Sequence, residues 1–561
     1  MVGIDGDGIS CPACTTGVSG LRRKRMSRRT VCTCVLTLVV LAATTATAQS
    51  FRVQCPASTI THPAASNNSE PSFTAATSLS AGPNGYLTPG ANINGAIKCQ
   101  QVSGGDGYAT MGDGHQIYMF SFGPLSGLAD IAAGKPGTEF PSVFNTPAPV
   151  TLMPGDPATT DGPAVGSTWP AVQPLGGFAW NGAVGQAPDP DNGNQIDGHV
   201  DPRPIMDIGV MNGNIPAPLI AIDEDDELFL TLTNVGMIMR PDLFEQHTIH
   251  FHGYPNASAF YDGVPDASVA VNIGGSFTYY YLSPDAGTYF WHCHISPPEH
   301  LQMGMVGQLY VRPRQDRVPA GTSLYTALQA QEGDLRTACI SATDILCTNP
   351  LPVVNNGATA VATVVNTGTG GYAYNDGDGS THYDVEYPLQ IHGFDPNFHF
   401  VGMTFNPEGF ADMKDKYFLL NGRSYPDTVT PGPMQTQSAD GSSHFSQALP
   451  SIINITKGQK ALLRISDLDV SEYQTLASLG IPMTVIGYNA KLLRDQDGNN
   501  MYYKTNSITL GGGESLDVIL DASDTAKYST GQVFYLYTPN LDHLSNDAEN
   551  FGGLMTEIHI N

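Results

Sequence analysis

Short strand-like segments recur along this 561-residue chain and restrict it to an all-β architecture. Several alternate apolar and polar residues with period two, including 228–234, 276–282 and 515–520, and Gly, Pro, Asp or Asn residues flank them. The chain contains 61 Gly and 41 Pro but only 14% charged residues, which excludes a coiled coil. We therefore predict β-sandwich or β-barrel domains that are joined by long loops.

Composition shifts divide the chain into five parts. Residues 22–29 are basic, 31–43 are apolar and 46–48 have the small residues of a signal-peptidase site. The short apolar stretch is typical of a signal peptide and not of a membrane span. The predicted parts are a leader and signal peptide (1–48), a Ser/Gly-rich extension (49–110), a first β domain (111–315), a linker with a short helix and a disulfide (316–380) and a second β domain (381–561).

The charge balance and the signal peptide predict where the protein acts. The formal net charge of −27 argues against nucleic acids and acidic membrane surfaces as partners. We expect an exported protein, periplasmic or extracellular, with no membrane span once the signal peptide is removed. The acidic run 223–227 might be thought to attract cations, but we interpret it as a solvated turn.

Cysteine parity singles out one thiol. Five cysteines follow the predicted cleavage site, and the pairs nearest in sequence are Cys55 with Cys99 and Cys339 with Cys347. Cys293 is then left without a partner. A buried inert cysteine is the ordinary explanation, but the neighbours of Cys293 favour a metal ligand.

Two short windows contain most of the candidate metal ligands, which are His247, His250, His252, His292, Cys293, His294, His300 and Met305. Alternate side chains of a strand point to opposite faces, so His250 and His252 share one face and His247 points to the other. In the second window His292 and His294 likewise share a face, opposite to Cys293.

Pairing the two windows in a barrel would sort these ligands into two groups. One thiolate (Cys293), two imidazoles (His247 and His300) and a weak axial thioether make a blue-copper electron-transfer site. The four remaining imidazoles would suit a second copper site on the other face. A structural zinc site is the competing interpretation, but it requires only four ligands and would leave several histidines unused.

With these motifs, the sequence resembles the multicopper oxidases, the laccase and metal-oxidase superfamily of cupredoxin domains. The matching stretch runs from Met211-Asn-Gly-Asn-Ile-Pro through His250-Phe-His252-Gly, Asp262-Gly-Val-Pro and Trp291-His-Cys-His to Met305. The resemblance implies two cupredoxin-like Greek-key domains, of which the second is copper-free. It also implies type 1 copper on His247, Cys293 and His300 with Met305 axial, type 2 copper on His250, and the type 3 pair on His252, His292 and His294.

The same resemblance gives roles to two further residues. Asp262 matches the acidic residue that the family places near its trinuclear copper cluster for proton delivery. His399, in the second domain, is interpreted as a packing or hydrogen-bonding residue. Spacing favours Met305 over Met303 as the axial ligand, because the His300-to-Met305 interval keeps the family's value.

The sequence departs from the family's pattern in two respects. Two extra residues, within 296–299, separate Cys293 from His300. The family's trinuclear cluster takes eight histidines, whereas this chain has four in the first domain and only scattered histidines in the second, namely His382, His392, His444, His543 and His559. Either a neighbouring subunit of a homo-oligomer, a trimer as in two-domain relatives, completes the cluster, or the site is smaller.

The leading functional prediction is an exported copper oxidase. A phenolic or metal-ion donor would give single electrons to type 1 copper near an exposed His300, and the second site would reduce dioxygen to water with protons supplied through Asp262. The alternatives are a copper nitrite reductase, whose family has no partners equivalent to His250 and His294, and a non-enzymatic electron carrier.

Overall fold

The computed structural model describes residues 55–145, 213–329, 351–352 and 364–561, apart from gaps at 64–67, 83–84, 86, 238, 254–258, 284, 403–408 and 438–442. Strands dominate these residues, and the few helices are short. The all-β prediction is confirmed. The predicted leader, the predicted cleavage site, most of the loop before residue 213 and both cysteines of the predicted 339–347 disulfide lie outside the described residues.

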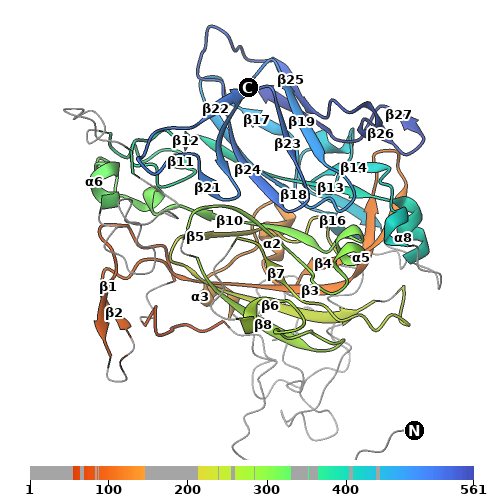
Figure 1. The fold of residues 1–561 in the computed structure, drawn as a ribbon, viewed down its shortest axis with the longest axis horizontal. Coiled ribbons are helices and arrows are strands. Elements are labelled where there is room, and N and C mark those ends of the chain that lie inside the picture. The colour runs from red at the N-terminus through yellow and green to blue at the C-terminus, as the bar shows by residue number, and fades with distance from the viewer. Residues whose placement is uncertain are drawn as a thin grey trace, which may run out of the picture. The chain divides into compact units, whose positions relative to one another are not determined.

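Two four-stranded sheets share the first apolar core and are here called the first sheet pair (Figure 1). One sheet has the order β4-β3-β6-β8 and the other β5-β10-β9-β7. Their strands are β3 (Ile97–Thr110), β4 (Gln116–Pro124), β5 (Ile220–Asp223), β6 (Glu227–Gly236), β7 (His250–Phe251), β8 (Ser276–Leu282), β9 (Gly287–His292) and β10 (Val306–Arg312).

A nine-stranded and a five-stranded sheet share the second core and form the second sheet pair. The larger has the order β21-β20-β24-β18-β13-β14-β26-β27, with β22 beside β20, and the smaller β17-β28-β25-β19-β23. Their strands are β13 (Val385–Phe394), β14 (Tyr417–Leu420), β17 (Ile453–Ile455), β18 (Lys460–Asp467), β19 (Gln474–Leu479), β20 (Met483–Tyr488), β21 (Lys491–Leu492), β22 (Tyr503–Thr505), β23 (Ser507–Leu510), β24 (Glu514–Asp521), β25 (Val533–Tyr537), β26 (Ser545–Asn546), β27 (Glu549–Asn550) and β28 (Met555–Ile560).

Short elements connect and flank these sheets. The two-stranded pairs are β1 (Ser78–Ala81) with β2 (Leu87–Ala91), β11 (Gly371–Tyr372) with β12 (His382–Tyr383), and β15 (Met434–Gln437) with β16 (Ser443–Gln447). The α-helices are α2 (Leu128–Ala132), α3 (Pro141–Phe144), α5 (Pro297–Gln302), α6 (Leu324–Gln329) and α8 (Pro396–Gly402). The 3₁₀ helices are η3 (Ala259–Tyr261), η4 (Arg314–Arg317), η6 (Phe410–Asp412), η7 (Asp427–Val429) and η8 (Leu541–His543).

Buried polar contacts join the two sheet pairs, which lie within one compact unit, residues 51–561. Gln308 of β10 donates to the carbonyl of Arg464 and to Ser466, both at 2.9 Å. Thr288 of β9 donates to Asp517 of β24 at 2.6 Å. Because such groups lose hydration on burial, these bonds fix how the two sheet pairs meet.

The first sheet pair begins earlier in the chain than the predicted extension allows. Strand β3 starts at Ile97, within 49–110, and runs parallel to β6 from Ile97 to Gly105. The Cys55–Cys99 disulfide is present, so that predicted pairing is confirmed. It ties the preceding segment to this central strand.

The interpretation of residues 223–227 as a solvated turn is wrong. Glu224, Asp225, Asp226 and Glu227 are at most 2% exposed. Hydrogen-bond donors from distant parts of the chain contact two of these carboxylates. Arg314 donates to Asp225 at 2.6 Å, and the amide of Ala96 donates to Asp226 at 2.7 Å. The acidic run is therefore a buried junction between the N-terminal segment, β6 and η4.

No helix within the described parts of the chain is long and apolar enough to cross a membrane.

Candidate metal centre

Strand pairing brings the two ligand windows together. Strand β7 is antiparallel to β9, with His250 opposite His292 and Phe251 opposite Trp291. Phe251 and the fully buried Trp291 belong to the first core, so packing of this face holds the register. The histidines that alternate with them consequently lie on the other face of the strand pair.

Cys293, His247 and His300 form a buried group, which we call the thiol cluster. Nδ1 of His300 lies 3.2 Å from Sγ of Cys293, and Nδ1 of His247 lies 4.0 Å from it. All three residues are 0% exposed. The amide of Thr248 donates to the same sulfur at 3.4 Å, which favours a thiolate.

Charge within the thiol cluster also favours the thiolate, the form that binds metals. Burial would raise the pKa of Cys293, but the imidazoles of His300 and His247 hold it well below its ordinary value. Burial would likewise lower the pKa of His300, but the Cys293 thiolate and Glu245 raise it to about 10. Burial is the main reason why the pKa of His247 is lowered.

Met305 and Met303 both belong to the same buried core cluster as Cys293. The amide of Cys293 donates to the carbonyl of Met305 at 3.2 Å, so that these two residues lie side by side in the backbone. Both methionine side chains are 0% exposed. The preference for Met305 as the axial ligand stays a prediction.

His300 is not exposed, and the prediction that electrons enter near an exposed His300 is wrong on this point. The segment after Cys293 folds into α5, and His300 lies in this helix with 0% exposure. Its Nε2 lies 3.6 Å from a carboxylate oxygen of Glu245, whose side chain is 30% exposed. Glu245 therefore lies between this imidazole and the surface, a position that no sequence pattern had indicated.

His250, His252, His292 and His294 form a second group, the imidazole cluster. Nε2 of His252 lies 2.9 Å from Nε2 of His292. The ring of His250 has its centroid 4.8 Å from that of His252 and 4.9 Å from that of His294. The structure thus brings together all four imidazoles that strand alternation predicts on one face.

Backbone carbonyls orient two rings of the imidazole cluster. Nδ1 of His250 lies 2.6 Å from the carbonyl oxygen of Asp262, and Nδ1 of His292 lies 2.7 Å from that of Cys293. The Asp262 carboxylate is 3.6 Å from the same His250 nitrogen. A carbonyl on Nδ1 fixes the tautomer and leaves Nε2 as the metal-binding nitrogen.

Burial keeps two rings of the imidazole cluster, those of His252 and His292, uncharged. It lowers the pKa of His252 to about 4 and that of His292 to about 3, and neighbouring imidazoles lower both further. Neutral imidazole is the form that binds a metal. His252 and His292 are therefore in their ligand form at neutral pH.

The donor sets differ in how well they fit the copper sites that the sequence predicts. A thiolate with two imidazoles and a nearby thioether fits type 1 copper. The second set has four imidazoles, which do not make up the eight of a trinuclear cluster. Four other described histidines already have a ring nitrogen in hydrogen-bond contact with another group of the protein. They are His382, His399, His543 and His559.

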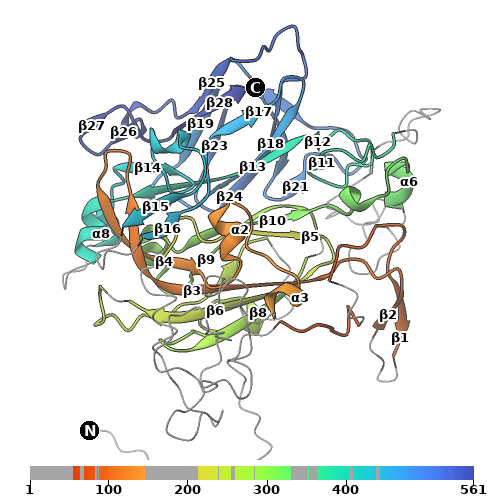
Figure 2. The ribbon, with the colours of Figure 1, turned by 180° about the vertical axis from the view of Figure 1, so that it is seen from behind.

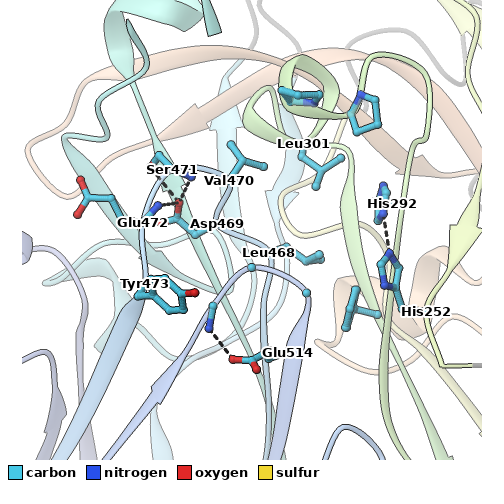
Figure 3. Close-up of a pocket in the computed structure, with 16 residues that line it drawn as sticks. His252, His292, Leu301, Leu468, Asp469, Val470, Ser471, Glu472, Tyr473 and Glu514 are labelled. Carbon is cyan, nitrogen blue, oxygen red and sulfur yellow. Dashed lines mark hydrogen bonds between the residues drawn. The ribbon is translucent and has the colours of Figure 1, made fainter. Parts of the chain in front are cut away.

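A cavity of about 610 Å³ opens beside the imidazole cluster (Figure 3). His252 and His292 line one side, and the loops 468–473 and 511–514 of the second sheet pair line the other. Its charged lining residues are Asp469, Glu472 and Glu514, and none of the described lining residues is Lys or Arg. These carboxylates carry no motif in the sequence and are found only through the tertiary contact.

Residues 197–316 match the family model described as multicopper oxidase. A stretch of 109 residues is 33% identical to laccase abr2 of Aspergillus fumigatus, and one of 118 residues is 31% identical to multicopper oxidase MmcO of Mycobacterium tuberculosis. Residues 197–316 are therefore similar to the multicopper oxidases. The match to each relative is partial: it covers 17% of laccase abr2 and 22% of MmcO, and 19% and 20% of this chain.

Among solved structures, the blue copper oxidase of Nitrosomonas europaea aligns with 62% of this chain and 78% of its own, at 21% identity and a TM-score of 0.40. The residues of this chain that match the family model contain both the thiol cluster and the imidazole cluster.

Proposed function

We propose that the chain is a copper-dependent oxidase that passes single electrons from a donor to dioxygen. The observation that carries this proposal is the adjacency of the two clusters. Cys293 of the thiol cluster is bonded in the chain to His292 and His294 of the imidazole cluster. Copper bound at both would supply one-electron uptake at the thiolate site and oxygen reduction at the imidazole site.

Each residue has a stated role in this proposal. His247, Cys293 and His300 hold type 1 copper with Met305 axial, His250 holds type 2 copper, and His252, His292 and His294 hold copper of the type 3 kind. The four imidazoles alone suggest a smaller site than the family's trinuclear cluster. A trimer that completes it remains a prediction, and a neighbouring copy of this chain would bring no second His-x-His pair beyond those at 250–252 and 292–294.

Asp262 is proposed to orient His250 and to supply protons. Its carbonyl oxygen lies 2.6 Å from Nδ1 of His250, and its carboxylate is 29% exposed. A partly exposed carboxylate beside the cluster can exchange protons with solvent and pass them inward. The donor is proposed to be a phenol or a low-valent metal ion, and the protein is proposed to act outside the cytoplasm.

The charge of the cavity favours an oxidase over a nitrite reductase. The cavity beside His252 and His292 is lined by three carboxylates and by no described cation. Like charges disfavour entry of an anion such as nitrite, whereas neutral dioxygen is unaffected. A nitrite reductase would also leave His250 and His294 without a role.

Metal analysis combined with oxygen uptake tests the proposed function. The wild-type holoprotein should be blue, contain more than one copper per chain and consume oxygen with a phenolic or metal-ion donor. Cys293→Ser should lose the intense blue absorption, and Met305→Leu should shift it, whereas the matched Met303→Leu should not. One copper per chain without oxygen uptake would indicate a carrier, and turnover of nitrite would indicate the reductase.

A further inference from the structure

We propose that the second sheet pair, which lacks a copper-binding motif, positions His300 by holding the end of helix α5 through Gln302. This inference rests on the proposed type 1 site in the thiol cluster. It makes Gln302 a positioning residue, because its side chain lies two residues from His300 and bonds away from the cluster.

Helix α5 needs external support to hold His300 in place. It spans only Pro297–Gln302 and follows Ser296, which has a φ of 38°. A helix of six residues is not stable on its own, because the free-energy cost of helix nucleation exceeds the stabilisation from its few hydrogen bonds. The segment 296–299, in which the sequence predicts two extra residues, overlaps the start of this helix.

Gln302 makes three contacts with the connection between β13 and β14 of the second sheet pair. Its Nε2 donates to Oδ1 of Asp415 at 2.9 Å, and its Oε1 accepts from the amide of Asp395 at 3.0 Å. Its carbonyl oxygen lies 2.9 Å from Nε2 of His399. Gln302 is 0% exposed, so its whole amide is satisfied within the protein.

The groups that hold Gln302 are themselves fixed. Asp395 accepts from the amide of Asn397 at the start of α8 and from that of Lys414, both at 2.8 Å. The other ring nitrogen of His399 lies 2.5 Å from the carbonyl of Tyr118 on β4, against which α8 packs (Figure 2). The groups that contact Gln302 are therefore held by hydrogen bonds of their own.

This anchoring bears on copper because ligand geometry sets the properties of a thiolate site. Nδ1 of His300 faces the Cys293 sulfur at 3.2 Å, and a shift of a few tenths of an ångström alters the overlap between thiolate and metal. The second sheet pair would thus determine the ligand field of a site to which it contributes no ligand. It also accounts for the buried His399, predicted to be a hydrogen-bonding residue and confirmed as one.

The structure offers a matched control for the test. Gln308 is also 0% exposed and also donates across to the second sheet pair, to Arg464 and Ser466, but it lies on β10 and not in the segment between Cys293 and Met305. Gln302→Met and Gln308→Met remove the same amide and keep similar volume. The two variants should therefore lose similar stability, measured by urea unfolding.

The readout is the visible absorption and electron paramagnetic resonance of the copper-loaded full chain. Gln302→Met should shift the thiolate charge-transfer band and the copper hyperfine splitting, and Gln308→Met should reproduce the wild-type spectra. If Gln302→Met does not fold, Gln302→Glu replaces it. In this variant one carboxylate oxygen keeps the bond to the Asp395 amide, and the other faces Asp415. We therefore expect a smaller shift of the charge-transfer band and of the hyperfine splitting, in the same direction.

Failure of the inference is separable from failure of the proposed function. A colourless wild-type holoprotein would overturn the type 1 site itself. A blue wild type whose spectra do not change in Gln302→Met or its substitute, or change equally in Gln308→Met, would overturn the positioning role and leave the oxidase proposal intact.

Discussion

Nε2 of His252 and Nε2 of His292 lie 2.9 Å apart, facing one another from neighbouring segments of the β7–β9 pair. Nδ1 of His292 is already committed to the Cys293 carbonyl at 2.7 Å. Partly buried nitrogens that converge in this way are well placed to bind a metal, because a shared ion satisfies both. The thiol cluster does not include either residue, so the two clusters can be altered separately.

Replacing His252 should damage only the imidazole cluster. For His252→Asn we expect less copper per chain and at least about a tenfold loss of oxygen uptake, since losing even an indirect support of a metal ligand costs about 10–100-fold. The blue absorption should persist, because Cys293, His247 and His300 are intact. His382→Asn serves as the control, because the His382 ring contacts the carbonyl of Thr369 and the ring of Tyr372, and neither residue belongs to the two clusters. Loss of the blue colour in His252→Asn would contradict the separation.

Gly104 on β3 leaves the space that the His247 ring occupies. A Cβ added at Gly104 would lie 2.6 Å from Cδ2 of that ring. Gly104→Ala should displace His247, shift the thiolate absorption and cost about 1–3 kcal/mol of stability through overpacking. Absorption spectra and chemical unfolding measure the two effects.

Gly137→Ala is the matched control for packing alone, because its Cβ would lie 2.7 Å from Cδ1 of Ile131. A similar stability loss with unchanged spectra is expected there. Equal spectral changes in both variants would show that His247 responds to general strain and not to its contact with Gly104.

Glu386 lies between two arginines where the sheet pairs meet. Arg312 donates to it at 2.7 Å and the fully buried Arg464 at 3.0 Å. Glu386→Gln would leave a buried cation without its counter-charge and should cost about 3–5 kcal/mol in urea unfolding. Asp521→Asn, which breaks a half-exposed pair with Lys460 at 3.8 Å, should cost no more than about 1 kcal/mol.

The contribution of Glu386 should depend on pH in one direction. Burial would raise its pKa, but Arg312 and Arg464 lower it from 4.5 to about 2. A carboxyl group whose folded pKa is depressed stabilises the fold above its unfolded pKa, and this contribution is lost as the pH falls through the folded value. The stability difference between wild type and Glu386→Gln should therefore be constant above pH 4.5 and shrink towards pH 2. A difference that grows on acidification would refute this assignment.

The Cys55–Cys99 disulfide closes a loop across 44 residues. In the chain-entropy account, a loop of this length should stabilise the fold by about 4 kcal/mol. The double variant Cys55→Ser/Cys99→Ser should unfold at a correspondingly lower urea concentration and retain the wild-type copper spectra, because the disulfide lies outside both clusters. An unchanged midpoint would mean that the segment around Cys55 is held by other contacts, such as the bond between His62 and Glu227 at 2.7 Å.

Local patterns in the sequence were sufficient to predict several features of the fold and of the candidate site. Alternation along 247–252 and 292–294 placed Cys293 with His247 and the four other imidazoles together, because strand geometry fixes which side chains share a face. The all-β class and the Cys55–Cys99 pairing also followed from local pattern and parity. The acidic run 223–227 shows the limit of such reasoning: its composition is that of a solvated turn, but Arg314 and Ala96 bury it from distant parts of the chain.

The sequence by itself determined which side chains of 247–252 and of 292–294 share a face, since a two-residue period needs no knowledge of distant segments. Only the tertiary structure decided what surrounds them: the burial of His300 under Glu245, the anchoring of α5 through Gln302, and the acidic cavity wall at Asp469, Glu472 and Glu514. These features arise from contacts between residues far apart in the chain, such as Gln302 and Asp415, which are 113 positions apart. Such contacts depend on how the sheets pack, and packing leaves no periodic signal along the chain.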